Sequence, residues 1–375
     1  MKESYVGLGV VGTGAIALRS ALDHMLPDIA GKVRIVAVFD PIFDRAKAAA
    51  AKYNVPAAYG SYEELLADPN VDAVTLCSPI GYHYEQCIKA LNAGKHIHSN
   101  KTITTAAAEV DDIKALAAKK GLRVVASPGM MLMPWNQRMR RLIIDGSIGE
   151  VTTAITGGGG GGLYHINEPY RHGDNILTNV NPTWYFRKPG GGPLYDVTVY
   201  YINILTGLLG PAKRVTAYAG QAIKSYEFRG ETIKNEIDDT IFMSIDFGGT
   251  LYALCFANTG GDLPGREGSF TPYILGTKGA LCGTKFNDKS LRYEDDHEPH
   301  VVGEHVKLAE NHVFEDIMQL VEWVRDGAPS IADLDHARAV ISIIEAAYES
   351  AATGKTIDLG PSSYKPMPLE ALAGI

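Results

Sequence analysis

The sequence lacks several features that would each define a class of protein. No apolar stretch reaches the roughly 18 residues that a membrane-spanning helix needs. The formal net charge is −8 and no long run of Lys and Arg occurs, which argues against a nucleic-acid or anionic-membrane partner, because phosphate binding needs clustered basic side chains. The first residues, MKESYVGLGVV, combine an acid with early glycines, unlike a secretory signal. We therefore expect a cytoplasmic protein that binds neither nucleic acid nor membrane.

Cysteine is also scarce. The cysteines are too few and too scattered for a disulfide scaffold, and no C-x-x-C pair indicates zinc; they are Cys77, Cys87, Cys255 and Cys282. His96 and His98 would lie on one face of a strand and could form half of a metal site, but no second pair of ligands is found nearby. We expect reduced thiols and no metal.

The first third of the chain alternates short apolar segments with helical patterns. The apolar segments are YVGLGVV, VRIVAVF, AVTLC, HIH and LRVVA, and helical patterns such as AAAEVDDIKALAAKKG between them end in glycine, which is common after a helix C-terminus. Continuous apolar strands joined by helices indicate a parallel sheet covered on both faces. With 375 residues, 46% of them hydrophobic, the chain is long enough for two domains. We predict a doubly wound α/β domain over residues 1–126.

Residues 127–375 follow a different rhythm. A helix over PWNQRMRRLIIDGSIG leads into long strands, among them DDTIFMSIDF and TLYALCFAN, which are joined by the turn signal FGGT. This pattern predicts a second, α/β domain with a large, mostly antiparallel open sheet. Its C-terminal helix and tail are free to pack back on the first domain.

Apolar residues lie on both faces of these strands, for example Ile241 on one face and Phe242 on the other. One face would be covered by the helices expected at 194–209, 309–326 and 333–352. The other face then needs a partner, so we expect a homodimer or homotetramer packed through this sheet. The run GGGGGG at 157–162 predicts a flexible loop.

The segment VGLGVVGTGAIA carries a glycine motif, Gly12-x-Gly14-x-x-Ala17, between the first strand and a helix. Gly12 permits a tight turn, Gly14 lets the backbone approach a pyrophosphate, and Ala17 allows close packing of helix on strand. This is the dinucleotide-binding fingerprint of a Rossmann domain. We predict that the cofactor binds at Gly12, Thr13, Gly14, Ala15 and Ile16.

The second strand, VRIVAVFD, ends in Asp40. A carboxylate there would accept hydrogen bonds from the adenosine ribose and repel a 2′-phosphate, which favours NAD over NADP. Two alternatives stay open. Asp40 could cap the helix after Pro41, or Arg45, one turn further on, could receive a phosphate and so allow NADP to bind.

These motifs and several later ones resemble the Gfo/Idh/MocA family, named after glucose-fructose oxidoreductase, inositol dehydrogenase and a rhizopine-catabolism oxidoreductase. VVGTGAIA and VAVFDP resemble its cofactor motifs, CSPIGYHYEQCIKALNAGKHI the segment before its catalytic lysine, GGGPLYDVTVYYIN its substrate-site helix, and ILGTKGAL and AAYESAATGKTIDL its late sheet and final helix. The resemblance covers nearly the whole chain. It implies an NAD(P)-binding domain followed by a domain for substrate binding and oligomerisation.

The resemblance also assigns residues to the nicotinamide end of the cofactor. These are Ser78, Pro79, His83, Asn100 and Lys101. His83 is explained equally well as a residue at a helix N-terminus.

The family writes Glu-Lys-Pro at its catalytic lysine, whereas this sequence has Asn100, Lys101 and Thr102. The resemblance implies that Lys101 reaches the substrate hydroxyl that loses its proton. An ammonium group at the carboxyl end of a parallel strand stabilises a developing alkoxide and can lower the pKa of a neighbouring acid. The family's Glu, which usually contacts the nicotinamide ribose, is replaced here by Asn100.

In GGGPLYDVTVYYIN, Asp196 matches the family's aspartate and Tyr200 stands at its histidine position, as in the family's glucose-fructose oxidoreductase and dihydrodiol dehydrogenase branches. The two residues are four apart, so they share one helix face and can reach one pocket. Next to Lys101, the ionised form of Tyr200 would be favoured, which would make it a proton acceptor near neutral pH. The alternative is that Tyr200 is a packed aromatic beside Tyr201.

The stretch 163–189 is long, aromatic and polar, and it lies between two site motifs. Loops of this kind often carry substrate specificity. Its candidates for contact with a polyhydroxylated ring are Tyr164, His165, Arg171, Asn181, Trp184 and Arg187.

The prediction is an NAD-dependent dehydrogenase that oxidises a hydroxyl of a sugar, sugar derivative or cyclic polyol. Tyr200 takes the hydroxyl proton, Lys101 stabilises the alkoxide and Asp196 positions a neighbouring hydroxyl. Two alternatives remain. One is a non-catalytic NAD-binding sensor, as in the galactose-repressor branch of the family, and the other is an NADPH-dependent carbonyl or imine reductase.

Overall fold

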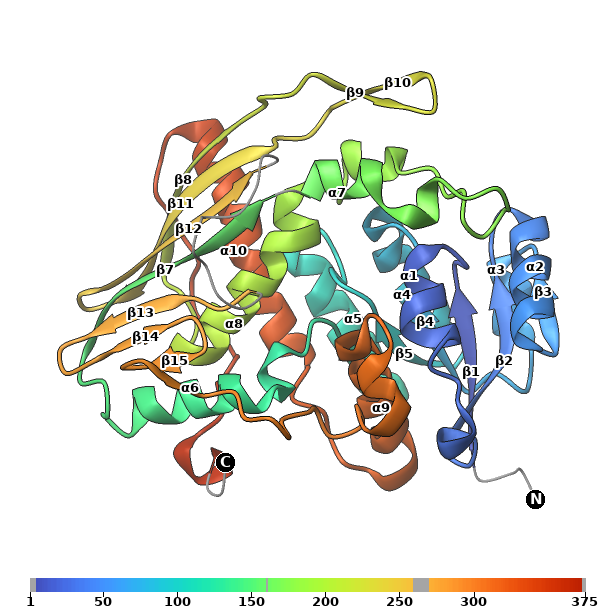
Figure 1. The fold of residues 1–375 in the computed structure, drawn as a ribbon, viewed down its shortest axis with the longest axis horizontal. Helices are drawn as coiled ribbons and strands as arrows, with labels where there is room; N and C mark the ends of the chain where they lie inside the picture. Colours follow the sequence, from blue (N-terminus) through green and yellow to red (C-terminus); the bar gives the residue numbers. More distant parts are fainter. Residues whose placement is uncertain (1–4, 160, 259–269, 373–375) are drawn as a thin grey trace.

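The computed structural model describes residues 5–159, 161–258 and 270–372. They contain two large sheets side by side and a separate two-stranded sheet (Figure 1). The first sheet is entirely parallel, in the order β3-β2-β1-β4-β5-β6. Its strands are β1 (Val6–Val11), β2 (Val33–Phe39), β3 (Ala57–Tyr59), β4 (Ala73–Leu76), β5 (His96–Ser99) and β6 (Val124–Ala126). This confirms the doubly wound prediction. Strand β3 was not predicted, because it is only 3 residues long and half-buried.

Every residue of β1 is buried, because helices cover both faces of the sheet. The first helical segment, α1 (Ala15–Ala17), continues directly into the π-helical turn η1 (Leu18–Leu22). The longer helices of this half are α2 (Phe43–Tyr53), α3 (Tyr62–Ala67), α4 (His83–Asn92) and α5 (Ala107–Lys120). Helix α5 ends at Gly121, whose left-handed φ of 65° fits the predicted glycine stop.

The second sheet is mixed and mostly antiparallel, as predicted, with the order β16-β15-β14-β13-β7-β12-β11-β8-β17. Among the described strands of this sheet, only β7 and β12 pair in parallel. The strands are β7 (Val151–Gly159), β8 (Arg214–Gly220), β11 (Thr240–Gly248), β12 (Leu251–Asn258), β13 (Tyr273–Gly276), β14 (Ala280–Cys282), β15 (Lys285–Phe286), β16 (Lys289–Ser290) and β17 (Ile357–Asp358). The predicted FGGT turn joins β11 to β12, with positive φ at Gly248 and Gly249.

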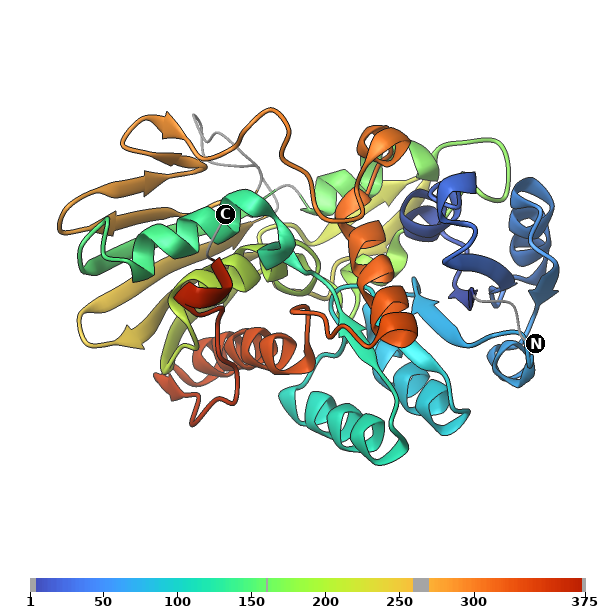
Figure 2. The ribbon, with the colours of Figure 1, turned by 90° about the horizontal axis from the view of Figure 1, so that it is seen from below.

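The inner face of the second sheet is covered by α6 (Pro134–Ile144), α8 (Val199–Leu209) and α10 (Leu334–Thr353). Ile241 of β11 is buried beneath them, as predicted. Helix α9 (Asn311–Asp326) was predicted to cover this sheet as well, and that prediction is wrong. Its buried Phe314 and Ile317 belong to the core of the first sheet, and Figure 2 shows α9 beside the first domain. The apolar stripe of a helix predicts that it packs, but not against which sheet.

The outer face of the second sheet stays exposed in the single chain. Tyr218 and Phe242 are paired across β8 and β11 and are 76% and 48% exposed. Other large apolar side chains exposed on this sheet are Tyr252, Leu254 and Leu275.

The glycine run does not form the predicted loop. Gly157 lies in β7, where its φ of 119° and the 2.2 Å separation that a Cβ would have from the Phe256 carbonyl oxygen exclude larger residues. Gly160 lies outside the described residues, and helix α7 (Gly161–Asn167) begins directly after it.

Residues 161–187, here called the cap segment, cross from the second sheet to the top of the first domain (Figure 1). The cap segment contains α7 and the 3₁₀ turns η5 (Pro169–Arg171) and η6 (Thr183–Phe186). A hydrophobic cluster, mostly aromatic, packs it against the hairpin of β9 (Ser225–Phe228) and β10 (Glu231–Lys234). Its buried members are Tyr185, Phe186, Tyr226, Phe228 and Ile233. Within the described ranges, no helix is long and apolar enough to cross a membrane.

Candidate active site

A cavity of about 1090 Å³ opens where the carboxyl ends of the parallel strands meet the cap segment and α8. Small-ligand sites usually hold about 300–1,000 Å³, so this cavity is at the upper end of that range. Open parallel sheets bind ligands at this edge.

The glycine motif forms one wall of the cavity. Gly12 has φ 87°, its amide donates to the Phe39 carbonyl at 2.7 Å, and a Cβ there would lie 3.2 Å from backbone atoms of Cys77. The cavity is lined here by Gly12, Gly14, Ala15 and Ile16. The backbone is therefore bare where a pyrophosphate would approach, which fits a dinucleotide.

Asp40 lies at the end of β2 and also lines the cavity. Its carboxylate accepts hydrogen bonds from the Thr13 amide (3.0 Å), the Thr13 hydroxyl (3.2 Å), the Ile42 amide (2.9 Å) and the Arg45 guanidinium (3.3 Å). A carboxylate offers about four acceptor positions, so a ribose hydroxyl would have to replace one of these donors. Thr13 was predicted to contact the cofactor, but it is fully buried behind the wall and holds Asp40 in place.

His83 is a second predicted cofactor residue that lies behind the cavity wall. It is fully buried, and its ring nitrogens lie 2.8 Å from the carbonyl oxygens of Ser78 and Thr102. Burial lowers the pKa of this imidazole. His83 therefore joins the loop after β4 to the loop after β5, while Ser78 and Pro79 line the cavity as predicted.

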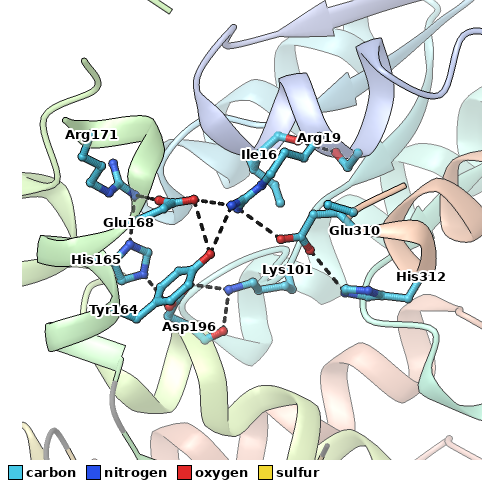
Figure 3. Close-up of polar contacts among 12 residues, drawn as sticks. Ile16, Arg19, Lys101, Tyr164, His165, Glu168, Arg171, Asp196, Glu310 and His312 are labelled. Atoms are coloured by element: carbon cyan, nitrogen blue, oxygen red, sulfur yellow. Dashed lines mark hydrogen bonds and ion pairs between the residues drawn. The ribbon is translucent and has the colours of Figure 1, made fainter. Parts of the chain in front are cut away.

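Lys101 reaches the centre of the cavity from the loop after β5. Asn100 is buried and its side-chain oxygen accepts from the Lys101 amide at 2.7 Å, while the Thr102 hydroxyl donates to the Tyr195 carbonyl at 2.7 Å. The Lys101–Thr102 peptide bond is cis. The ammonium group of Lys101 donates to both the carboxylate and the carbonyl oxygen of Asp196 (Figure 3).

Asp196 is held between two partners. It lies on the π-helical turn η7 (Leu194–Thr198), and its second carboxylate oxygen accepts from His165 Nε2 at 2.7 Å. Burial alone would raise the pKa of Asp196, but Lys101 and His165 together lower it below its ordinary value. Arg171 donates to His165 Nδ1 at 2.9 Å, so the proton of the neutral ring belongs on Nε2. Burial lowers the pKa of His165, which keeps the ring neutral.

The network continues through Arg19, Glu168 and Glu310, which the sequence analysis did not predict. Arg19 of η1 pairs with Glu168 of the cap segment, lies 3.1 Å from Glu310 and donates to the Tyr164 hydroxyl at 3.2 Å (Figure 3). Arg171 lies 3.1 Å from Glu168. Positive and negative side chains therefore alternate across the part of the cavity lined by Lys101, Asp196 and the cap segment. We call this part the substrate side, and the part lined by the glycine motif and Asp40 the cofactor side. The one sequence signal for Arg19 is its place two residues after the glycine motif.

Tyr200 lies on the same face of η7 and α8 as Asp196, as predicted, and it lines the cavity. Its ring stacks on Phe270 with centroids 4.6 Å apart, and Lys101 Nζ lies 5.5 Å from the ring centre. The prediction that Lys101 favours the phenolate is wrong. Burial raises the pKa of Tyr200 well above its ordinary value, and the carboxylates of Glu310 and Asp196 raise it further. The ammonium group is instead committed to Asp196.

The predicted substrate residues divide into two groups. Those that line the cavity are Tyr164, His165, Arg171, Asn181 and Trp184. Arg187 is exposed and does not line the cavity. Among the described residues, no three His, Cys, Asp or Glu side chains are grouped as metal ligands, and both ring nitrogens of His98 contact hydroxyl groups, of Thr75 and Ser127.

Comparison with known families agrees with this geometry. Residues 6–127 match the model of an oxidoreductase family with an NAD-binding Rossmann fold, and residues 140–359 match that family's C-terminal alpha/beta domain. The chain belongs to this family, Gfo/Idh/MocA, and is an NAD(P)-binding oxidoreductase.

Several relatives are similar over different lengths. The chain is 31% identical over 201 residues to an uncharacterized oxidoreductase, ORF334, of Rhizobium meliloti, which spans 52% of this chain and 54% of that protein. It is 28% identical to mouse trans-1,2-dihydrobenzene-1,2-diol dehydrogenase over 72% of each chain. It is 25% identical to D-glucoside 3-dehydrogenase of Escherichia coli over 96% of this chain and 99% of that one. An oxidoreductase domain protein from Kribbella flavida has the same fold, with a TM-score of 0.77 and 19% identity over 95% of this chain and 100% of that chain.

Proposed function

We propose that the protein is a cytoplasmic NAD-dependent dehydrogenase that oxidises a hydroxyl group of a neutral sugar, glycoside or cyclic polyol. The observation that carries this proposal is the partly buried ion pair of Lys101 and Asp196 beside Tyr200, at the edge of the sheet where the glycine motif approaches the same cavity. The relatives named as a glucoside dehydrogenase and a dihydrodiol dehydrogenase support a cyclic alcohol as substrate.

The mechanism divides the work between cofactor and protein. Bound NAD would supply the hydride acceptor, and the residues fitted to hold it are Gly12, Gly14, Ala15, Ile16 and Asp40. Lys101 stabilises negative charge that develops on the substrate oxygen, since an ammonium in a partly buried site interacts strongly with an oxyanion. Asp196 accepts a hydrogen bond from a neighbouring hydroxyl, and Tyr200 receives the proton of the reacting hydroxyl. His165 and Arg171 orient Asp196.

The charge balance of the site supports a neutral substrate. Among the described residues, each cation on the substrate side already has a carboxylate partner: Lys101 has Asp196, Arg171 has Glu168, and Arg19 has Glu168 and Glu310. A sugar acid would bring a carboxylate into a site whose cations are neutralised, which is unfavourable. Hydroxyl groups, in contrast, can both donate to the acids and accept from the cations.

The sensor alternative is less compatible with the site. Keeping a lysine and an aspartate paired inside a cavity has a desolvation cost, and the pair is weak as a source of stability. A charged pair that is costly to bury and that faces a ligand cavity is more typical of a catalytic site than of a sensor's binding site.

The exposed outer face of the second sheet supports a homodimer or homotetramer. An apolar patch that contains Tyr218 and Phe242 is unusual on a monomer, and two copies could bury it symmetrically. Light scattering on a Tyr218→Glu, Phe242→Glu double variant tests this assembly. The assembly formed by the variant should have a smaller molar mass in solution than that of the wild-type protein. Equal molar masses would contradict assembly through this face.

A spectrophotometric screen for NADH formation tests the function. The purified protein is incubated with NAD or NADP and with glucose, methyl glucosides, glucuronides, cis- and trans-cyclic diols and inositols. We expect NADH from a neutral glycoside or polyol and little from the matched glucuronide. Tight NAD binding without turnover of any alcohol would favour the sensor instead.

A further inference from the structure

The neutral state of Tyr200 raises the question of where the substrate proton goes. A phenol that does not ionise can accept a proton only if it passes its own proton to another base at the same time. Lys101 cannot be that base while it is a cation paired with Asp196. A neutral acceptor in contact with the Tyr200 hydroxyl is needed.

His312, in the first turn of α9, meets this need. Its Nε2 lies 3.1 Å from the Tyr200 hydroxyl, which is hydrogen-bonding distance, and the two rings meet edge to face with centroids 5.5 Å apart. His312 lines the cavity, and its side chain is 22% exposed. A proton received there has a route to water.

The surroundings of His312 favour a neutral ring that can be protonated briefly. Burial lowers the pKa of this imidazole, Glu310 opposes that effect, and Lys101 lowers the pKa further. Glu310 Oε2 lies 3.8 Å from Nε2, close enough to stabilise an imidazolium. The groups that face His312 are therefore Tyr200 from α8, Lys101 from the loop after β5 and Glu310 from its own segment. Arg19 of η1 in turn pairs with Glu310 (Figure 3).

We propose that His312 is the proton acceptor that acts through Tyr200. As the substrate O–H bond breaks, its proton passes to the Tyr200 oxygen, and the Tyr200 proton passes to His312 Nε2. The hydride from the same substrate carbon goes to the oxidised cofactor. A neutral alcohol, NAD⁺ and a neutral imidazole thus become a ketone, NADH and an imidazolium, which later releases its proton to water. This inference rests on the proposed dehydrogenase activity.

The kinetic test uses methyl α-D-glucopyranoside and NAD, with kcat and KM measured across pH. The wild-type rate should fall at acid pH, where His312 is protonated and cannot accept. His312→Gln keeps a hydrogen-bonding group near Tyr200 but accepts no proton, so kcat should drop by about 10²-fold with little change in KM, and the acid limb should disappear. Added imidazole should restore part of the rate in His312→Gly. A matched control is His297→Gln, at an exposed histidine outside the cavity.

Glu310→Gln adds a directional check. Because Glu310 raises the pKa of His312, its removal should move the acid limb to lower pH. A purely structural role for His312 predicts no such movement. An unchanged kcat and acid limb in His312→Gln, or a limb that does not move in Glu310→Gln, overturns the relay.

A second readout separates failure of the relay from failure of the proposed function. In ¹⁵N-histidine-labelled protein with NAD bound, the His312 resonances are identified by their loss in His312→Gln. Nε2 should be unprotonated at neutral pH and should shift in Tyr200→Phe. A protonated Nε2, or one that does not respond, overturns the relay whether or not the glucoside reacts. No turnover with the expected Nε2 signal contradicts the substrate proposal alone.

Discussion

The two sides of the cavity hold their polar groups in different ways. On the cofactor side, the backbone does much of the work: Asp40 accepts from the amides of Thr13 and Ile42, and His83 contacts two backbone carbonyls. On the substrate side, ionic side chains hold one another, with Asp196 between Lys101 and His165. Groups held by backbone should tolerate the loss of one side chain, whereas a network of charges should not.

The largest expected effect is on catalysis. Lys101→Met removes the ammonium but keeps a chain of similar length, so kcat/KM should fall by about 10³-fold while NAD affinity changes little. The control is Lys114→Met, on the exposed face of α5. A loss below about tenfold would mean that the substrate-side charges do not contribute to the reaction.

The second largest expected effect is on stability, where substitutions on the two sides of the cavity should have unequal costs. Asp196→Asn leaves Lys101 without its buried partner and should lower the free energy of unfolding by about 3–5 kcal/mol. Asp40→Asn keeps an acceptor for the Thr13 donors and should cost about 1–3 kcal/mol. Urea denaturation at neutral pH measures both variants. Equal losses of unfolding free energy in the two variants would contradict the expected difference between the two sides.

Two buried acids should give opposite pH dependences. Asp316 accepts hydrogen bonds from the Ser127 hydroxyl and the Gly129 amide, in the loop after β6. Burial raises the pKa of Asp316 from 3.8 to about 7. The folded protein therefore binds this proton more tightly than the unfolded chain, so the stability from Asp316 is present below about pH 4 and is lost as pH rises to about 7. The lowered pKa of Asp196 has the opposite sign, and its contribution is lost only as pH falls below 3.8.

Unfolding of Asp316→Asn at several pH values checks this sign. Relative to this variant, the wild-type protein should lose stability between pH 4 and 7. A difference that stays constant with pH would show that Asp316 is ionised throughout.

The smallest effect is expected at the rim of the cofactor side. Arg45 pairs with Asp40 and lines the cavity, where it could meet a 2′-phosphate. Arg45→Ala should weaken NADP by about tenfold and leave NAD unchanged or slightly tighter, because Asp40 regains a free acceptor position. Calorimetric titration with both dinucleotides measures this. Equal weakening of both would place Arg45 at the shared part of the cofactor.

The difference between the two sides of the cavity also explains which features could be predicted from the sequence. The first sheet and its glycine motif depend on local patterns, so the strands, Gly12 and Gly14 could be located by reading along the chain. Lys101 and Asp196 were found through motifs of the family. His312 and Glu310 belong to no such motif, and they reach the site only because α9 packs on the first sheet. That packing depends on tertiary contacts, which local sequence patterns do not reveal. The burial of His83 and the place of Arg187 outside the cavity depend on tertiary contacts in the same way.

Arg19 shows how far the two halves depend on each other. It belongs to the nucleotide-binding half, yet its partners Glu168 and Glu310 come from the cap segment and from the residue before α9. Recombination that exchanged only residues 6–127 with another family member would therefore transfer Arg19 together with the dinucleotide preference. Arg19 would then be separated from the acids that it pairs with. New specificities in such a scaffold are more readily reached when the position of Arg19 and its two acids change together.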